Sequence, residues 1–348
     1  MSTLVGADPA VIGPYLASVF GDDRWKSVAV ELIAAGMSNL TYTVTPTDGS
    51  PDAAVILRRP PTGAVLATAH DMAREYKVIT GLGPTDVPVP RTLHLCEDTA
   101  VLGAPFYVME RVVGVHVVSE IPAGYADEPA QRRAIGDGLV DVLADLHGVD
   151  YAAVGLTDFG RPEGFMARQV RRWTKQWDAT RDRDRPGMDA LAARLAETVP
   201  MTQRDGITHG DYRLDNCLLD PEVPGRIRAV LDWEMSTLGD PLADLGLLLV
   251  YWPEAGEQLP ATLSSVTALP GFPTRTEVAE RYASRTGLDL SGISWYVGFA
   301  YFKFAAIVAG IVARSAAGAM AGKDTSGYAD RIDPCVELGR AALDDGAI

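Results

Sequence analysis

The alternation of hydrophobic and polar residues follows two different patterns along the chain. Up to about residue 110, short runs rich in β-branched and aromatic residues are separated by turn residues, which is typical of strands joined by hairpins. Two segments of this region, 9–21 and 68–82, instead repeat their apolar residues at helical spacing. We therefore expect a small sheet of about five strands that carries one helix, with the earlier helix capping it.

The rest of the chain follows the helical pattern. In residues 131–148 an apolar stripe ends at Gly148, and glycine is a common residue at a helix C-terminus. Residues 165–181 predict another helix. Strands first and helices later predict an α+β fold with two lobes, 1–110 and 111–348, and a cleft between them.

Residues 292–314 are almost wholly apolar and long enough to cross a bilayer. Lys303 lies at the centre of this segment, where a charge is costly in lipid. The segment has no basic flanks, and no second apolar segment accompanies it. We interpret it as a buried helix of the larger lobe and expect no membrane contact.

Composition narrows the classes of partner. The net charge of −15, from 31 Lys and Arg against 46 Asp and Glu, argues against nucleic acid and anionic membranes. The three cysteines are widely spaced and form neither a metal-binding pattern nor a disulfide framework, and the N-terminus does not read as a signal peptide. We therefore expect a reduced, cytoplasmic protein. Histidines such as His147 lack zinc-ligand spacing, and we expect them to be surface or cap residues.

Residues 207–234 hold the candidate chemistry. Asp211 lies in a polar turn, Asn216 follows five residues later, and a predicted β-hairpin then ends at Asp232. Because a hairpin returns its far end to the place where it began, we expect these three side chains to converge. Two carboxylates and an amide oxygen suit Mg²⁺, which takes its remaining ligands from phosphates and water. Phosphoryl transfer needs such a metal together with a carboxylate that orients the attacking hydroxyl.

The HGD-x4-N run followed by LDWE resembles the aminoglycoside phosphotransferase and choline kinase superfamily, and its Asp–Asn spacing is that of the protein-kinase catalytic loop. The resemblance implies that Asp211 is the catalytic base and that Asn216 and Asp232 hold Mg²⁺. It implies that His209 shapes the loop and that the two lobes form a protein kinase-like fold. Arg213 stands where kinases have a lysine near the transferred phosphate, and it would either stabilise transition-state charge or pair with a structural carboxylate.

The segment after LDWE also resembles the family. Asp240 and Asp244, in GDPLADLG, would support the catalytic loop without reacting themselves. Gly36, Ser38 and Asn39 would form the loop that covers the phosphates, with glycine allowing close backbone approach.

The run AVILRR resembles the strand that carries the kinase lysine, with an arginine in its place. Arg58 would bind the α- and β-phosphates and pair with Glu75 of the following helix, while Arg59 would point to the other face and be solvated. An arginine presents a planar fork instead of a point charge, so the phosphate geometry would differ.

The run FYVMERV resembles the kinase hinge. The backbone groups of Glu110 and Val112 would contact adenine, and Met109 would line its pocket. A plain edge strand would explain the same residues.

The chain looks most like the subgroup whose domain is joined to acyl-CoA dehydrogenases in animal proteins. This resemblance implies an ATP- and Mg²⁺-dependent kinase acting on a small-molecule hydroxyl group, with a hydroxyacyl-CoA or another hydroxylated metabolite as acceptor. Aromatic residues of the larger lobe, including Trp173 and Trp177, would either line the acceptor pocket or pack the core. The arginine at position 58 leaves a second reading open, a nucleotide-binding pseudokinase that serves as a regulatory or scaffold module.

Overall fold

The structure is a computed structural model that describes residues 6–35, 39–49, 53–62, 71–257, 264, 266–318, 325 and 327–348. The chain divides into two compact units. The first consists of Met1–Gly114, Ala152–Phe159 and Arg228–Ser236, and the second of Val115–Tyr151, Gly160–Ile227 and Thr237–Ile348.

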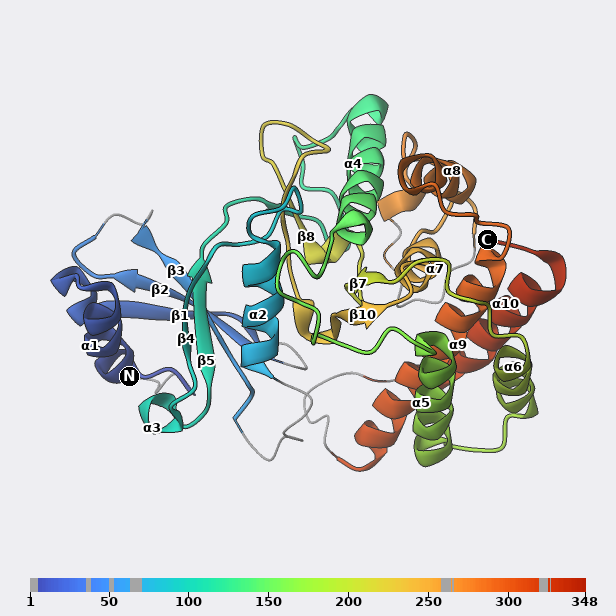
Figure 1. The fold of residues 1–348 in the computed structure, drawn as a ribbon, viewed down its shortest axis with the longest axis horizontal. Coiled ribbons are helices and arrows are strands. Elements are labelled where there is room, and N and C mark those ends of the chain that lie inside the picture. Colours follow the sequence, from blue (N-terminus) through green and yellow to red (C-terminus); the bar gives the residue numbers. More distant parts are fainter. Residues whose placement is uncertain are drawn as a thin grey trace. The chain divides into compact units, whose positions relative to one another are not determined.

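The first unit is built on a five-stranded antiparallel sheet with the strand order β1-β2-β3-β5-β4 (Figure 1). Its strands are β1 (Val28–Ala35), β2 (Leu40–Pro46), β3 (Val55–Arg59), β4 (Thr92–Cys96) and β5 (Phe106–Glu110). Its helices are α1 (Pro9–Phe20), α2 (Met72–Leu82) and α3 (Thr99–Leu102), with 3₁₀ turns η1 (Asp23–Lys26) and η4 (Trp233–Met235). The small sheet expected from the sequence is confirmed.

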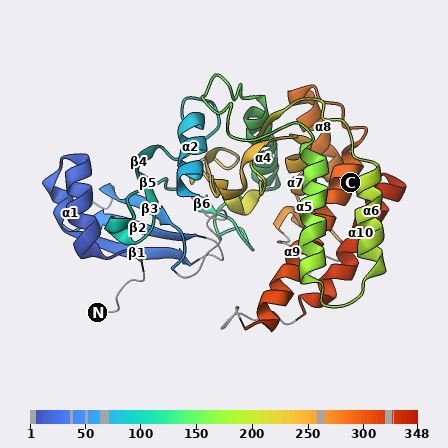
Figure 2. The same ribbon diagram turned by 60° about the horizontal axis from the view of Figure 1, so that its bottom comes forward.

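The two faces of this sheet are covered by different helices, because successive side chains of a strand point to opposite faces. Helix α1 packs on β1, whereas α2 packs on β4 and β5, and the two helices lie on opposite sides of the sheet (Figures 1 and 2). The core on the α1 side gathers buried residues such as Tyr42, Leu57 and Phe106. Burying one such side chain contributes about 1.5–3 kcal/mol to folding.

Neighbouring arginines of β3 therefore have different surroundings. Arg58 faces the α2 side, where it meets Glu75. Arg59 faces the α1 side, and the expectation that it would be solvated is wrong: its side chain is buried and donates to the carbonyl oxygens of Gly6, Pro60 and Leu102. The chain preceding α1 covers this face and supplies an acceptor that the strand pattern did not reveal.

The second unit is mostly helical, so the α+β fold expected from the sequence is confirmed. Its helices are α4 (Pro129–Gly148), α5 (Phe165–Thr180), α6 (Pro186–Glu197), α7 (Leu242–Val250), α8 (Arg275–Thr286), α9 (Ile293–Ala316) and α10 (Ile332–Asp345), with 3₁₀ turns η3 (Leu214–Asn216), η5 (Val266–Ala268) and η6 (Ala329–Arg331). Its short strands are β6 (Val115–His116), β7 (Gly206–Thr208), β8 (Cys217–Leu219) and β10 (Thr237–Gly239), while β9 (Ile227–Val230) leads from the second unit into the first.

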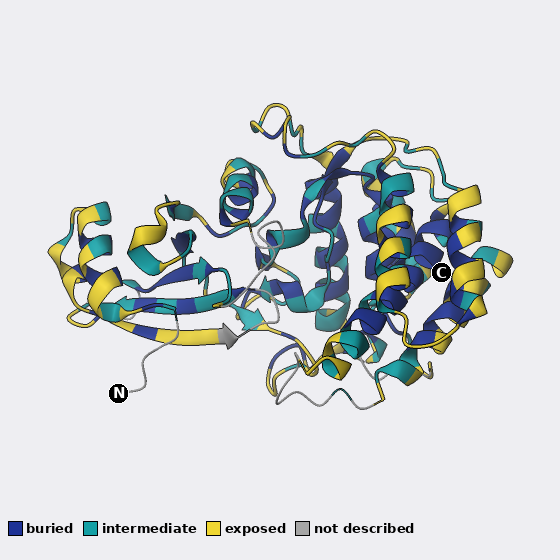
Figure 3. Ribbon diagram, turned by 90° about the horizontal axis from the view of Figure 1, so that it is seen from below, coloured by how far each residue is buried: buried dark blue, intermediate teal, exposed yellow. Residues whose placement is uncertain are grey.

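Helix α9 is the apolar segment that resembles a membrane span. Among the described residues it is the one helix long and apolar enough to cross a bilayer, and 78% of its most apolar window is buried within the protein. It packs against α5, α7 and α10. The helices around it are buried on their inward sides and exposed on their outward sides (Figure 3). This burial supports the interpretation of α9 as a core helix.

Candidate functional site

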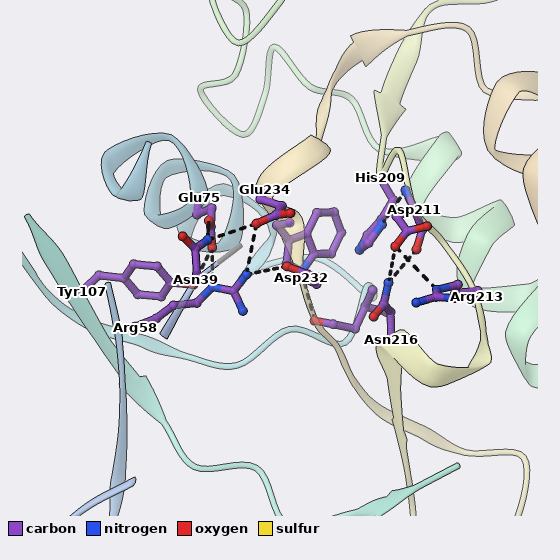
Figure 4. Close-up of polar contacts among 12 residues, drawn as sticks. Asn39, Arg58, Glu75, Tyr107, His209, Asp211, Arg213, Asn216, Asp232 and Glu234 are labelled. Atoms are coloured by element: carbon purple, nitrogen blue, oxygen red, sulfur yellow. Dashed lines mark hydrogen bonds and ion pairs between the residues drawn. The ribbon is translucent and has the colours of Figure 1, made fainter. Parts of the chain in front are cut away.

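The loop between β7 and η3 carries the first group of candidate residues. Gly210 adopts a left-handed backbone conformation (φ +84°), which favours glycine, and so allows the chain to turn immediately before Asp211. The amide nitrogen of Asn216 donates to the backbone oxygen of Asp211 at 2.8 Å and to its Oδ2 atom at 3.1 Å (Figure 4). The Asp211 carboxylate is therefore held in one orientation, with 26% of its side chain exposed.

Asp244 stabilises the backbone of this loop. Its carboxylate accepts the backbone N–H groups of His209 at 2.6 Å and Gly210 at 2.9 Å, and the Nε2 atom of His147 lies 3.3 Å away. Burial alone would raise the pKa of Asp244, but the hydrogen bond and charge of His147, with His209 and the Gly210 amide, lower that pKa below its ordinary value. The carboxylate is thus kept ionised as a support of the loop.

His147 is part of this support. The expectation that it would be a surface or cap residue is wrong, because it is fully buried on α4 and its Nδ1 atom lies 2.6 Å from the Tyr282 hydroxyl group of α8. The chain Tyr282–His147–Asp244 joins three helices to the loop. Its members are far apart in the sequence, so no spacing could indicate it.

Asp240 has a different environment from Asp244. It accepts the hydroxyl groups of Thr202 and Tyr296, each at 2.8 Å, and the backbone N–H of Leu242. These bonds fix the start of α7 to α9 and to the segment before β7. The described contacts of Asp240 support the helix that carries Asp244, and of these two carboxylates it is Asp244 that bonds the loop directly.

Arg213 lies between two carboxylates. Its Nη2 atom is 2.9 Å from the Oδ2 atom of Asp215, and its Nε atom is 3.5 Å from the Oδ2 atom of Asp211. The guanidinium also lies 4.9 Å from the centre of the Tyr251 ring, within the range of a cation–π contact. Arg213 therefore places positive charge next to Asp211 and is also paired with the carboxylate of Asp215.

Lys303, noted in the sequence for its place in an apolar helix, reaches the same loop. Its ammonium group donates to the carbonyl oxygen of Gly210 at 2.8 Å. Burial lowers the pKa of Lys303, and the nearby charges of Asp211 and Asp244 oppose this shift. A charge inside the core helix thus stabilises the turn that presents Asp211.

The first unit carries the second group of candidate residues, centred on Arg58. Its Nε atom lies 2.9 Å from Glu75, and the guanidinium also contacts Asp232 and, at 3.7 Å, Glu234 (Figure 4). The pairing of Arg58 with Glu75 that the sequence suggested is thus present. Burial disfavours the charge of Arg58, but the surrounding carboxylates and Tyr107 raise its pKa above the ordinary value.

Asn39 and Tyr107 complete this cluster. The Asn39 amide donates to Glu75 at 2.8 Å and to Glu234 at 3.1 Å, and the Tyr107 hydroxyl donates to Glu75 at 3.0 Å. Burial raises the pKa of Glu75, while Arg58 and these hydrogen bonds oppose the rise. Gly36 and Ser38, the other expected members of the phosphate-covering loop, lie outside the described residues.

Asp232 has an unusual backbone. Its φ of +64° and ψ of 59° lie in the left-handed region, which is uncommon for residues other than glycine. Such a conformation costs on the order of 1–3 kcal/mol and is found most often at functional sites. The conformation turns the chain from β9 into η4 and directs Asp232 toward Arg58.

The expected hinge lies on β5. This strand is flanked by β3 and β4, so the interpretation as a plain edge strand is wrong. Met109 is buried, and the backbone N–H of Glu110 donates to the carbonyl oxygen of Arg91, while the Glu110 side chain accepts the Arg91 N–H. Val112 follows the strand and is partly buried. The contacts of Met109, Glu110 and Val112 with adenine stay a prediction.

The chemistry of the donors fits a divalent cation. In the first unit one guanidinium faces three carboxylates, Glu75, Asp232 and Glu234, which leaves excess negative charge. In the second unit Asn216 presents an amide beside Asp211. No group of three or more His, Cys, Asp or Glu side chains within the described part of the chain could hold a metal ion by itself. Mg²⁺ commonly uses only one or two carboxylates and binds substrate phosphates with the rest.

Comparisons with known proteins define the class. The phosphotransferase enzyme family model matches residues 29–280, and the chain belongs to this family. A crystal structure from Ralstonia eutropha JMP134, provisionally named an aminoglycoside phosphotransferase, is 35% identical with a TM-score of 0.78, and the match covers 91% of this chain and 93% of that one. The aminoglycoside phosphotransferase APH(4)-Ia, solved with ADP and hygromycin B, is 15% identical with a TM-score of 0.60. The match covers 97% of this chain and 99% of that one, and at this identity it shows the shared fold. The chain is therefore a small-molecule phosphotransferase with a kinase-like fold.

The subgroup is also confirmed. Acyl-CoA dehydrogenase family member 10 of Mus musculus is 35% identical over 307 residues, which are 87% of this chain but 28% of that protein. The chain thus matches a minor part of this relative. The dehydrogenase activity that the relative's name implies is not carried over to this chain.

Proposed function

We propose that this phosphotransferase uses Mg²⁺ and transfers the terminal phosphoryl group of ATP to a hydroxyl group of a small molecule. The observation that carries the proposal is the oriented carboxylate of Asp211, held by Asn216 on a loop that Asp244 supports. The ADP complex of an aminoglycoside phosphotransferase with the same fold supports the choice of an adenine nucleotide.

Asp211 would act as the base. Its carboxylate accepts the proton of the acceptor hydroxyl as the oxygen of that group bonds to the γ-phosphorus, and the bond from phosphorus to the β,γ-bridging oxygen breaks to release ADP. Arg213 would stabilise the negative charge of the transferring group, because its guanidinium lies 3.5 Å from the base. His209 would shape the loop through its Nδ1 atom, which accepts the Asp211 N–H at 3.2 Å.

Nucleotide binding would use the first unit. Arg58 would bind the α- and β-phosphates with Glu75 as its anchor, Asn39 would lie at the end of the phosphate-covering loop with Gly36 and Ser38, and the hinge around Glu110 would bind adenine. Asn216 and Asp232 would hold Mg²⁺, which neutralises phosphate charge when bound. Asp232 belongs to the first unit and Asn216 to the second, so their use of one metal ion stays a prediction.

The acceptor would be a hydroxylated metabolite, and a hydroxyacyl-CoA is the leading candidate. The likeness to acyl-CoA dehydrogenase family proteins supports this choice, because a domain joined to such an enzyme commonly acts on related compounds. A cytoplasmic location is likewise proposed from the sequence alone.

The deciding experiment replaces the base. The full chain is incubated with labelled ATP, Mg²⁺ and a metabolite extract, the phosphorylated product is identified, and kcat is then measured with it. Asp211→Asn should lower kcat by about 10²–10⁴-fold and leave the Kd for ATP nearly unchanged. Asp158→Asn, at an exposed aspartate paired only with Lys77 among the described contacts, is the control and should keep full activity. Full activity of Asp211→Asn would remove Asp211 from the role of base.

The pseudokinase alternative rests on Arg58, which stands in place of the usual lysine and contacts the carboxylate proposed as a magnesium ligand. In that case the protein would bind ATP without transferring its phosphate to any compound in the extract. The intact set of Asp211, Asn216 and Asp232 favours the active enzyme.

A further inference from the structure

A buried indole N–H lies without a hydrogen-bond partner close to the catalytic loop. Trp173 of α5 is 6% exposed, and its Nε1 atom has no acceptor within the described part of the chain. Buried donors are nearly always bonded, and one that is not calls for a specific explanation. Trp177, one helical turn further along α5, is also buried, but its Nε1 atom donates to Asp189 at 2.8 Å. The missing partner is therefore a property of position 173 and not of tryptophans on this helix.

A second donor lies over the ring of Trp173. The ammonium group of Lys303 lies 5.7 Å from the centre of the Trp173 ring, and α5 packs directly on α9. An ammonium group has three donors. One of those of Lys303 is used by the carbonyl oxygen of Gly210, the residue before the proposed base. The ammonium group thus lies between the unpaired indole and the loop that presents Asp211.

The charges around Trp173 indicate which kind of ligand group could bind there. Lys303 and Arg172, whose guanidinium lies 5.5 Å from the Trp173 ring, place positive charge beside the indole, while the carboxylates of Asp211 and Asp244 act on Lys303 from the side of the catalytic loop. Positive charge and N–H donors disfavour an amine and favour an oxygen that accepts hydrogen bonds, while the Trp173 ring favours an apolar chain.

We propose that Trp173 and Lys303 bind a carbonyl or carboxylate oxygen of the acceptor, next to the hydroxyl group that Asp211 deprotonates. The inference rests on the proposed phosphotransfer and assigns the residues that would select hydroxy acids or their thioesters over amino sugars and amino alcohols. Trp173 and Lys303 are then the residues that determine acceptor specificity.

The test uses four acceptors that share one carbon skeleton and one hydroxyl position. They are 3-hydroxyoctanoate, its pantetheine thioester, octane-1,3-diol and 1-aminooctan-3-ol. With the full chain, Mg²⁺ and ATP, kcat/KM for the acid or the thioester should exceed that for the diol by at least about tenfold, as expected for one or two hydrogen bonds. The amine should be the poorest acceptor. A higher value for the acid identifies a carboxylate as the preferred group, and a higher value for the thioester identifies a carbonyl.

Two variants test the residues. Trp173→Phe keeps an aromatic ring but lacks the N–H, so the acceptor KM should rise about tenfold, with a smaller effect on the ATP KM. Lys303→Met should abolish the preference over the diol, and Lys303→Arg should retain part of it. Trp177→Phe is the matched control, because it removes an N–H that is bonded within the protein. It should lower thermal stability and leave the acceptor KM unchanged.

The outcomes separate the two proposals. Equal use of acid, thioester and diol, or an unchanged acceptor KM in Trp173→Phe, would overturn the inference while phosphotransfer itself stands. Hydrolysis of ATP without transfer to the acid or the thioester would also overturn it. A wild-type protein that neither hydrolyses ATP nor transfers its phosphate would contradict the proposed function, and the inference with it.

Discussion

Arg58 contacts the carboxylate of Asp232, although Asp232 is the residue that we propose as a magnesium ligand. The same guanidinium is anchored 2.9 Å from Glu75, whose side chain is only 2% exposed. The planar fork of arginine can hold two carboxylates at once, which a lysine does less well. In the nucleotide complex Asp232 would exchange this partner for the metal, and one face of the guanidinium would become available to phosphate.

Arg58→Met should weaken both nucleotide binding and folding. The variant leaves Glu75 buried and without its positive partner, so the free energy of unfolding should fall by about 3 kcal/mol. The Kd for ATP should rise at least about tenfold. Urea unfolding and isothermal titration calorimetry measure the two effects.

Arg59→Met provides the matched control, because Arg59 is the next residue, is also buried, and within the described residues donates to backbone oxygens on the other face of the sheet. It should lose stability and keep the Kd for ATP. Adding Glu75→Gln to Arg58→Met should recover part of the lost stability, since the unpaired charge is then gone. If the stability losses of the two single variants simply add in the double variant, Arg58 and Glu75 are not coupled.

Asp232→Asn should abolish the stabilisation that magnesium and ATP provide together. A ligand at 100 times its Kd stabilises a protein by about 2.7 kcal/mol, which is readily seen as a rise in Tm. The variant removes the charge that the metal requires and should show no further rise in Tm when Mg²⁺ is added to ATP. Glu234→Gln, at a carboxylate 3.7 Å from Arg58, serves as comparison and should retain most of the magnesium effect. A normal magnesium effect in Asp232→Asn would exclude Asp232 as a ligand.

Arg213→Gln distinguishes the two roles that the sequence left open. If the guanidinium stabilises the transferring phosphoryl group, kcat should fall by about 10²-fold with little change in the ATP KM. If Arg213 only fixes the loop through Asp215, 2.9 Å away, then Asp215→Asn should cause an equal loss. We expect Asp215→Asn to lose less than about tenfold. Steady-state kinetics at saturating acceptor measures the comparison.

The local parts of this protein were accessible from the sequence. The strands of the first unit and α1, α4 and α5 follow from apolar periodicity, and the pairing of Arg58 with Glu75 followed from the family pattern. Such features depend on side chains that are close in the chain or on motifs that fix their spacing. The family itself could be identified from the segments around Asp211 and Asp232.

Long-range polar contacts were not accessible. His147 and Tyr282 lie 135 positions apart, and the oxygen that Arg59 bonds in Gly6 lies 53 positions away. The buried side chains of His147 and Arg59 were expected at the surface or in solvent. A polar residue can be buried only when a hydrogen-bond partner reaches it, and that partner depends on tertiary packing. Glu234 was missed for the same reason, although its place two residues after Asp232 is a signal that could have found it.

Asp244→Asn should be most damaging at neutral pH and less so in acid. The Asp244 carboxylate holds the amides of His209 and Gly210, so the variant should lower kcat by at least about 10²-fold and the free energy of unfolding by about 3 kcal/mol. The pKa of Asp244 is lowered in the folded protein, so its contribution is fully present above the unfolded value of about 3.9. It is lost as the pH falls from there through the folded pKa. The difference in unfolding free energy between wild type and variant, measured by urea unfolding between about pH 3 and 7, should therefore shrink at the acid end. Asp240→Asn, which breaks bonds to Thr202 and Tyr296 instead, should lose stability but keep kcat. A difference that is constant over the whole range would show that the charge of Asp244 does not support the loop.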